Sequence, residues 1–186
     1  MRITSGILRS RRFEVPKQEV RPTMESVREA VFSSLGGSCA GLRVLDLFAG
    51  SGALGLEAWS RGAESVTFVE QHAAVFRNLQ QNIESLKCDE LGEVCCIRAD
   101  ALKWLERADT PFDLILADPP YDLPGAMYAT CEGIANGSVL TADGMLVYEL
   151  RSLDNLKIPE GWTVLRDKTY GKTRVVMLKQ EKEDAP

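Results

Sequence analysis

Residues 112–121 read Phe-Asp-Leu-Ile-Leu-Ala-Asp-Pro-Pro-Tyr, and the interpretation of the whole chain starts from this stretch. The apolar run from Leu114 to Ala117 predicts a strand that is buried on both faces of a parallel sheet. Pro119 and Pro120 lack the N–H groups that continue a ladder, so they end the strand in a stiff, extended corner. That corner is expected at the carboxyl end of the strand, where open α/β sheets bind ligands.

The corner has the chemistry to hold an aromatic amine in one orientation. The Asp118 carboxylate and the Pro119 carbonyl are two acceptors for the two N–H groups of an exocyclic amine. Tyr121 offers a flat face on which a planar base can stack. A packed Asp-Pro-Pro turn is the purely structural alternative, which the position after a buried strand disfavours. The predicted catalytic residues are Asp118, Pro119, Pro120 and Tyr121.

A glycine-rich loop lies upstream of this corner. Residues 46–55 read Asp-Leu-Phe-Ala-Gly-Ser-Gly-Ala-Leu-Gly, so the G-x-G-x-x-G spacing falls between a predicted strand and a predicted helix. Such a loop lets a ligand approach the backbone at a helix N-terminus, and by itself it fits NAD or FAD. Asp46 favours another cofactor, because its carboxylate repels a pyrophosphate and suits the cationic amino group of a methionine-type tail.

Two further carboxylates follow the next predicted strands. Glu70 ends the second strand and can accept two ribose hydroxyls, a contact that serves either type of cofactor. Asp100 follows the third strand, where it can accept from an adenine amino group, cap the next helix, or do both. The carboxyl ends of parallel strands meet at one edge, so a common rim is expected. The predicted cofactor-binding residues are Asp46, Phe48, Gly50, Ser51, Gly52, Glu70, Asp100 and Ala101.

Strands and helices alternate from residue 42, which predicts a doubly wound, Rossmann-like α/β fold with a mostly parallel, seven-stranded sheet. The expected strands are 43–48, 66–70, 94–97, 112–118 and 145–150, and the expected helices are 53–61, 73–86, 101–107 and 124–135. Residues 162–165 and 174–178 are expected to form a C-terminal antiparallel hairpin.

The expected domains are 1–38, 39–180 and a frayed tail at 181–186. The first is an appendage with a β-hairpin at 3–15 and a helix capped by Thr23, and it is too small to fold alone. The second is the α/β domain, on which the appendage is expected to dock.

Basic side chains gather near the N-terminus although the chain has a net charge of −5. Residues 1–28 hold seven basic and three acidic side chains, a balance of +4, and residues 166–179 hold five basic side chains against one acidic. The asymmetry fits a polyanionic partner and an ordinary solvated surface about equally well. The arginines predicted to contact such a polyanion are Arg9, Arg11, Arg12, Arg21 and Arg28.

Composition excludes several classes of protein. No apolar run approaches membrane-spanning length and no secretory h-region is present, so a soluble, cytoplasmic protein is expected. Nothing in the sequence suggests more than a monomer. The five cysteines include no C-x-x-C pair and are expected as buried, reduced thiols. His72 is the only histidine, so no metal site is expected.

Three stretches together resemble the RsmD-type bacterial methyltransferases of small-subunit ribosomal RNA. They are 46–58 (DLFAGSGALGLEA), 118–121 (DPPY) and 21–32 (RPTMESVREAVF), and the segment from Arg2 to Phe13 extends the resemblance over nearly the whole chain. The first two occur in many S-adenosylmethionine enzymes, whereas the third is the more family-specific. Met24-Glu25 departs from the Thr-Asp-like pair expected in that third stretch.

The resemblance implies a class I methyltransferase fold with S-adenosyl-L-methionine as cofactor. It also implies methylation of a guanine N2 amino group in 16S rRNA, either as free RNA or in the assembling small subunit. The residues alone leave three alternatives open. One is a methyltransferase for adenine N6 or a protein amide, another is a nucleotide-binding oxidoreductase, and the third is a silent RNA-binding assembly factor.

Overall fold

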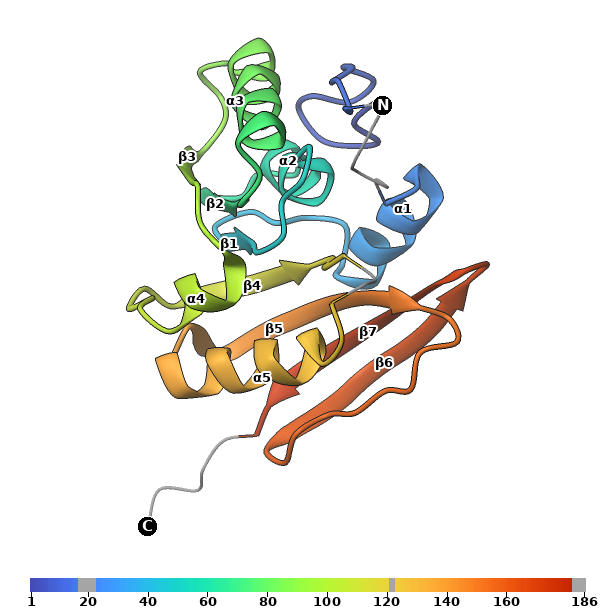
Figure 1. The fold of residues 1–186 in the computed structure, drawn as a ribbon. Helices are drawn as coiled ribbons and strands as arrows, with labels where there is room; N and C mark the ends of the chain where they lie inside the picture. The colour runs from blue at the N-terminus through green and yellow to red at the C-terminus, as the bar shows by residue number, and fades with distance from the viewer. Residues whose placement is uncertain (17–22, 121–122, 182–186) are drawn as a thin grey trace. The chain divides into compact units, whose positions relative to one another are not determined.

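The computed structural model describes residues 1–16, 23–120 and 123–181, which form two compact units, Met1–Ala101 and Leu102–Pro186 (Figure 1). The seven strands have the order β3-β2-β1-β4-β5-β7-β6, with the first three in the first unit and the others in the second. Three strand pairs are parallel and the two pairs that involve β7 are antiparallel. The predicted α/β class, with its C-terminal antiparallel hairpin, is confirmed.

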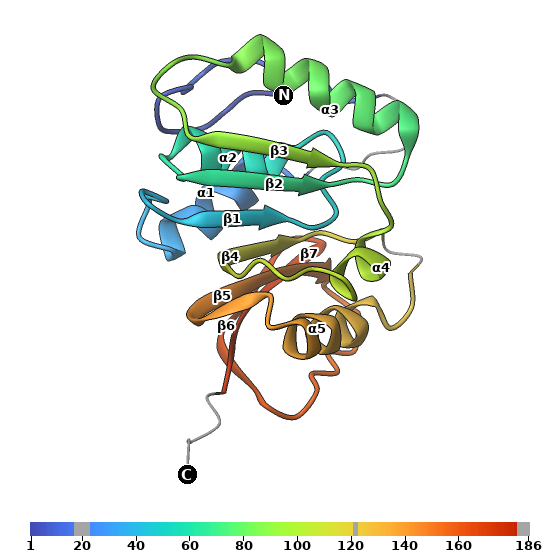
Figure 2. The same ribbon diagram turned by 90° about the vertical axis from the view of Figure 1, so that its left-hand side faces the viewer.

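The first unit is built on three parallel strands, β1 (Arg43–Asp46), β2 (Ser65–Val69) and β3 (Glu93–Ile97), which lie side by side in Figure 2. Helix α2 (Ala53–Ser60) packs on β1 and β2 and is buried along its whole length. Helix α3 (Ala73–Leu86) turns an apolar stripe inward that includes Leu79, Ile83 and Leu86. Both helices match the sequence prediction to within one residue.

The second unit contains β4 (Phe112–Ala117), β5 (Leu140–Arg151), β6 (Trp162–Tyr170) and β7 (Thr173–Gln180), with helix α5 (Ala126–Gly137) packed on β5. A short helix, α4 (Ala101–Leu105), begins at the boundary between the units. Residues 114–117 of β4 are all buried, as their apolar run predicts. Strand β5, with 12 residues, is six residues longer than predicted, and β6, with 9 residues, is five residues longer.

Residues 1–16, here called the N-terminal segment, fold back on themselves and belong to the first unit. The predicted hairpin is reduced to a single antiparallel bridge between Arg2 and Arg12, and Ile3, Leu8 and Phe13 anchor the segment in the core. The boundary between the compact units falls between residues 101 and 102, and the expected domain boundary after residue 38 stays a prediction. The Glu181 N–H donates a hydrogen bond to the Gly161 carbonyl, whereas the rest of the expected tail lies outside the described residues.

Helix α1 (Glu25–Ser34) starts later than predicted, and Thr23 is not its N-cap. Met24 occupies that position without a side-chain bond, while Thr23 is buried and its carbonyl accepts a hydrogen bond from Arg28 Nη1 at 2.8 Å. The buried Arg28, which the sequence pattern does not reveal, thus fixes the backbone just before the helix but does not cap its N–H groups.

The five cysteines are free thiols, but only Cys39 and Cys131 are buried, and Cys95 is exposed. The expectation of uniformly buried thiols is therefore wrong for β3, whose side chains are exposed or half-buried. No helix in the described part of the chain has the length and hydropathy needed to cross a membrane. The described residues also hold no cluster of three acidic, His or Cys side chains arranged for a metal ion.

Candidate cofactor loop and acceptor cleft

The loop between β1 and α2 is a tight turn that requires glycine. Gly50 and Gly52 have φ values of +54° and +90°, and the Gly52 N–H donates to the Ala49 carbonyl at 2.7 Å. A Cβ atom at Gly52 would lie 2.6 Å from Leu79 Cδ1. The turn brings the backbone of residues 49–52 to the N-terminal end of α2, and the N–H groups of Ala49, Gly50 and Gly52 donate within the protein. The N-terminal end of a helix attracts negatively charged and polar ligand groups.

Asp46 ends β1 and is 1% exposed. Its Oδ2 atom accepts a hydrogen bond from the Gly55 N–H at 2.8 Å, so the carboxylate anchors the first turn of α2. A Cβ at Gly55 would stand 2.9 Å from that oxygen and 2.3 Å from Phe68 Cε1. The third glycine of the motif is thus needed for close packing of helix on sheet, and Asp46 has a structural partner besides the contact with the cofactor that we predict.

Glu70 follows β2 directly, and both of its carboxylate oxygens are oriented by backbone groups. One oxygen accepts from the Gly50 N–H at 3.0 Å and the other accepts from the His72 N–H at 2.6 Å. Each carboxylate oxygen has a second acceptor site, so two ribose hydroxyls can still be bound. The structure therefore holds Glu70 beside the loop in a fixed orientation, while its contact with ribose stays a prediction.

Asp100 and Ala101 lie where β3 passes into α4. Asp100 is exposed and directly precedes the helix, whereas Ala101 is 7% exposed. Asp46 is the last residue of β1, and Glu70 and Asp100 come after β2 and β3. The three strands are parallel neighbours, since Asp46 pairs with Phe68 and Val69 pairs with Ile97. The rim predicted for the first three strands is present within the first unit.

Ser51 gives independent support for a ligand at this loop. It is 1% exposed, and its Oγ atom has no hydrogen-bond partner among the described residues. A buried hydroxyl without a partner costs free energy unless a ligand or water satisfies it. Phe48, half-buried beside the loop, supplies apolar surface. The glycine turn, the fixed carboxylates and the orphaned hydroxyl fit an adenosyl cofactor with a polar tail.

Asp118 directly follows β4 in the second unit. The register pairs Ala117 with Tyr148, so Asp118 lies level with Glu149 at the carboxyl ends of two parallel strands. Asp118 is half-buried, Pro119 is buried and Pro120 is exposed. Tyr121, predicted to stack on the substrate base, lies outside the described residues.

A cleft of about 680 Å³ opens beside this corner. Pro119 and Pro120 form part of its wall, the end of β5 at residues 148–150 forms another, and the start of α5 and residues 154–157 supply the rest. Glu149 lines this cleft although it is only 6% exposed. Burial, followed by the neighbouring Cys131 and Asp118, raises the pKa of Tyr148, so its phenol stays protonated. Sequence reasoning missed Glu149, because a single acidic residue in an apolar strand has no motif around it.

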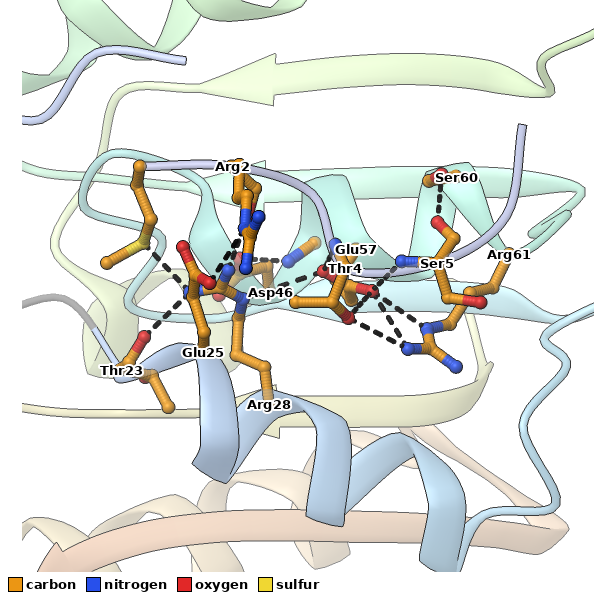
Figure 3. Close-up of polar contacts among 12 residues, drawn as sticks. Arg2, Thr4, Ser5, Thr23, Glu25, Arg28, Asp46, Glu57, Ser60 and Arg61 are labelled. Carbon is orange, nitrogen blue, oxygen red and sulfur yellow. Dashed lines mark hydrogen bonds and ion pairs between the residues drawn. The ribbon is translucent and has the colours of Figure 1, made fainter. Parts of the chain in front are cut away.

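Arg28 does not fit its predicted contact with RNA. Its side chain is fully buried, donates to the carbonyls of Thr23 and Arg2, and lies 3.6 Å from Glu57 (Figure 3). Desolvation lowers the pKa of Arg28, and the charge of Glu57 opposes that shift. A side chain with no exposed surface cannot reach a phosphate, so Arg28 is a structural residue.

The other predicted arginines differ in their availability. Arg9 and Arg12 are exposed, whereas Arg11 donates to the Ser85 carbonyl at 2.8 Å, and Arg21 lies outside the described residues. In the second basic stretch, Arg174 pairs with Asp167 and Lys179 pairs with Asp143. The positive charge available to a polyanion is therefore smaller than the count of basic residues indicates.

Comparisons with known proteins cover nearly the whole chain. The family described as "Conserved hypothetical protein 95" matches residues 1–179. "Ribosomal RNA small subunit methyltransferase D" of Escherichia coli K12 is 33% identical over 184 residues, covering 97% of this chain and 90% of the relative. The protein of that name from Haemophilus influenzae is 35% identical over 175 residues, covering 92% and 89%. The solved structure of "Putative methyltransferase yhhF from Escherichia coli" has a TM-score of 0.87 at 31% identity, covering 98% and 99% of the two chains.

Proposed function

This chain belongs to the family described as "Conserved hypothetical protein 95", and relatives that are 33% and 35% identical over most of it are rRNA small subunit methyltransferases. We therefore propose a specific reaction for it as an S-adenosylmethionine-dependent rRNA methyltransferase. In this reaction a methyl group passes from S-adenosyl-L-methionine to the exocyclic N2 amino group of a guanine in small-subunit ribosomal RNA. Membership in this family excludes the oxidoreductase that the glycine motif alone left open.

The observation that carries the choice of guanine is the pair of carboxylates at the ends of β4 and β5. Guanine presents adjacent N1–H and N2–H donors, which suit carboxylate acceptors at Asp118 and Glu149. Adenine has an acceptor at N1 beside its N6 amino group, so a carboxylate facing that edge is repelled. The buried Glu149 in the cleft therefore supports a guanine acceptor over an adenine one.

The residues of the corner position the reacting nitrogen. The Asp118 carboxylate and the Pro119 carbonyl accept from the N2 hydrogens, which aims the nitrogen lone pair in one direction. S-adenosylmethionine, when bound, supplies a methyl group on a positively charged sulfur. Positioning of this kind can contribute about 7–11 kcal/mol to lowering a barrier. Asp118 is also placed to take the proton that N2 sheds after methylation.

The cofactor-binding roles belong to the loop between β1 and α2. Gly50, Ser51 and Gly52 form the turn, Glu70 is oriented toward ribose hydroxyls, and Asp46 suits the ammonium group of the methionyl tail. We further propose a cytoplasmic monomer that acts on 16S rRNA or on the assembling small subunit. The names of the relatives and the exposed Arg9 and Arg12 support this proposal.

The proposed reaction is tested with labelled S-adenosylmethionine and unmethylated small-subunit rRNA, offered free and in particles, followed by digestion to nucleosides. We expect label in N2-methylguanosine. Label in N6-methyladenosine would overturn the choice of base while keeping the cofactor. Label in protein alone would overturn the choice of RNA.

RNA contact by the N-terminal segment is tested by charge reversal at its exposed arginines. Arg9→Glu with Arg12→Glu should weaken RNA binding and make its salt dependence shallower, because each lost phosphate contact removes about 0.7–0.9 from the slope of log K against log salt. Titrations of labelled rRNA at several salt concentrations measure both quantities. Arg107→Glu, at another exposed arginine, is the matched control, and an unchanged salt slope in the double variant would contradict the proposal.

A further inference from the structure

A buried amide on α3 joins the N-terminal segment to the cofactor loop. Asn82 is 3% exposed, and its Oδ1 atom accepts from the Glu14 N–H at 2.9 Å. Its Nδ2 group donates to the Glu14 carbonyl at 2.8 Å and to the Ser51 carbonyl at 3.0 Å. Asn78 Oδ1 lies further away, at 3.3 Å. One side chain thus holds the peptide of Glu14 and the carbonyl of Ser51.

The number of N–H donors on the Asn82 amide makes this connection specific. An asparagine amide has two N–H groups, and here the two shortest bonds use one for each segment. A displacement of Glu14 therefore tilts the amide and misaligns the bond to Ser51. Ser51 lies between Gly50 and Gly52, the two glycines of the turn that have positive φ values. The hydrogen bond to its carbonyl therefore holds the backbone of the loop in one orientation.

We propose that Asn82 is a positioning residue, and that through it the docked N-terminal segment holds the cofactor loop in its binding conformation. This inference rests on the proposed function, because it assumes that the loop binds S-adenosylmethionine. Two linked sites strengthen each other reciprocally. Cofactor binding should therefore tighten the N-terminal segment, and docking of that segment should tighten cofactor binding.

The N-terminal segment has a second anchor that does not touch the loop. Ser60 Oγ, at the far end of α2, accepts from the Leu8 N–H at 2.9 Å and donates to the Ser5 carbonyl at 2.6 Å. Ser60→Ala therefore removes one buried and one partly buried hydrogen bond to the same segment and none to the cofactor loop. It is the matched control for changes at Asn82.

The test measures the affinity for S-adenosylhomocysteine, a non-reacting product, by calorimetry on the full chain at a temperature where each variant is folded. Asn82→Ala should weaken binding roughly tenfold, the effect of losing a buried hydrogen bond of ordinary strength. Asn82→Asp keeps the acceptor for the Glu14 N–H but loses both donated bonds, so it should weaken binding at least as much. Ser60→Ala should stay within about twofold of the wild type, because Ile3, Leu8 and Phe13 keep the segment docked and Asn82 keeps its bond to the loop.

Hydrogen exchange on the wild-type chain supplies a readout that needs no variant. S-adenosylhomocysteine should slow exchange of the Glu14 amide, whose bond to Asn82 senses the loop. Unchanged Glu14 exchange in the liganded wild type, or equal weakening by Ser60→Ala and Asn82→Ala, would overturn the inference and leave the proposed function intact. A wild type that binds no S-adenosylhomocysteine would overturn the proposed function and this inference with it.

Discussion

Asp118 is the residue on which the proposed chemistry depends most directly. Asp118→Ala removes an acceptor for the substrate amine, so we expect turnover to be lost while cofactor affinity stays within severalfold of the wild type. Single-turnover assays and calorimetry with S-adenosylhomocysteine measure the two effects separately. Asp109→Ala, at an exposed carboxylate in the same unit, is the control. Loss of both turnover and cofactor affinity in Asp118→Ala would show that Asp118 is a structural residue.

Glu149 is the residue that we expect to select guanine. Glu149→Gln keeps the shape of the side chain but replaces an acceptor with an N–H donor that opposes the donors of guanine. We expect kcat/KM for rRNA to fall about 10–100-fold, which corresponds to the discrimination of a bidentate base contact of about 1–3 kcal/mol.

The control for Glu149 is Asp154→Asn, which changes an exposed carboxylate of the same cleft. Its kcat/KM should stay close to that of the wild type. An equal loss in both variants would show that the cleft responds to net charge rather than to a specific contact, and the proposed selection by Glu149 would fail.

Single residues were predicted best where a motif surrounds them. The sequence places Asp46, Gly50, Gly52 and Glu70 correctly beside one loop, because strand ends and glycine spacing are local signals. Arg28 was misassigned, because an arginine on a helix looks the same whether it faces solvent or a buried carboxylate. Its buried partner, Glu57, is 29 residues further along the chain, and no local pattern in the sequence indicates the pair.

At the scale of elements, helix α2 packs closely on β1 and β2, so this contact tolerates little change. Gly55→Ala would place a methyl group 2.3 Å from Phe68 Cε1 and 2.9 Å from Asp46 Oδ2, so α2 must shift. Overpacking of this kind costs about 1–3 kcal/mol. We expect a lower urea midpoint together with weaker binding of S-adenosylhomocysteine, since the helix carries the loop.

Gly133→Ala is the matched control for Gly55→Ala, because both glycines lie inside helices. Its Cβ would meet Leu105 side-chain atoms at 3.2 Å, a contact that small side-chain shifts relieve. Its urea midpoint should stay near that of the wild type or rise, and its cofactor affinity should not change. Unaltered cofactor binding in Gly55→Ala would show that α2 can move without disturbing the loop.

The observed strand lengths differ from the predicted ones where the alternating pattern of apolar and polar residues stops. Strand β6 was predicted only as far as residue 165, because residues 166–169 are polar and exposed and lack the alternation of a half-buried strand. They are nevertheless paired with β7 as far as Tyr170. An edge strand is held by its ladder on one side, and backbone pairing does not require apolar side chains.

Across the first unit, stability depends on a buried ionic network that centres on Glu57. Glu57 is fully buried and accepts hydrogen bonds from Thr4 and Ser5, while Arg61 pairs with it at 2.9 Å and Arg28 lies at 3.6 Å (Figure 3). Glu57→Gln leaves buried positive charge without its partner, so we expect a loss of about 3–5 kcal/mol in the free energy of unfolding. Urea denaturation measures this loss.

The exposed pair Arg2–Glu25 is the control for this network. Glu25→Gln should cost less than about 1 kcal/mol, because solvent screens the charges of an exposed pair. Combining Arg28→Leu with Glu57→Gln should recover part of the loss, since no unpaired charge then remains at position 28. Equal effects of Glu25→Gln and Glu57→Gln would contradict the assigned role of burial.

At the scale of the whole chain, the α/β class and the order of strands and helices follow from the alternating pattern, and the structure confirms them. The packing of the N-terminal segment does not follow from it. That segment is held by single side chains such as Glu57, Ser60 and Asn82, whose partners are 52 to 68 positions away in the sequence. Such contacts form only in the completed fold, so they cannot be predicted from a short stretch of sequence.

The network around Glu57 also has a consequence for the newly made chain. A ribosome releases the N-terminal segment and α1 first, yet the groups that hold them, Glu57 and Ser60 on α2 and Asn82 on α3, are synthesised later. Arg28 therefore emerges with its charge still in water and loses its hydration only when α2 arrives. Residues 1–16, although translated before the rest of their unit, therefore gain these contacts only after α2 and α3 have been made.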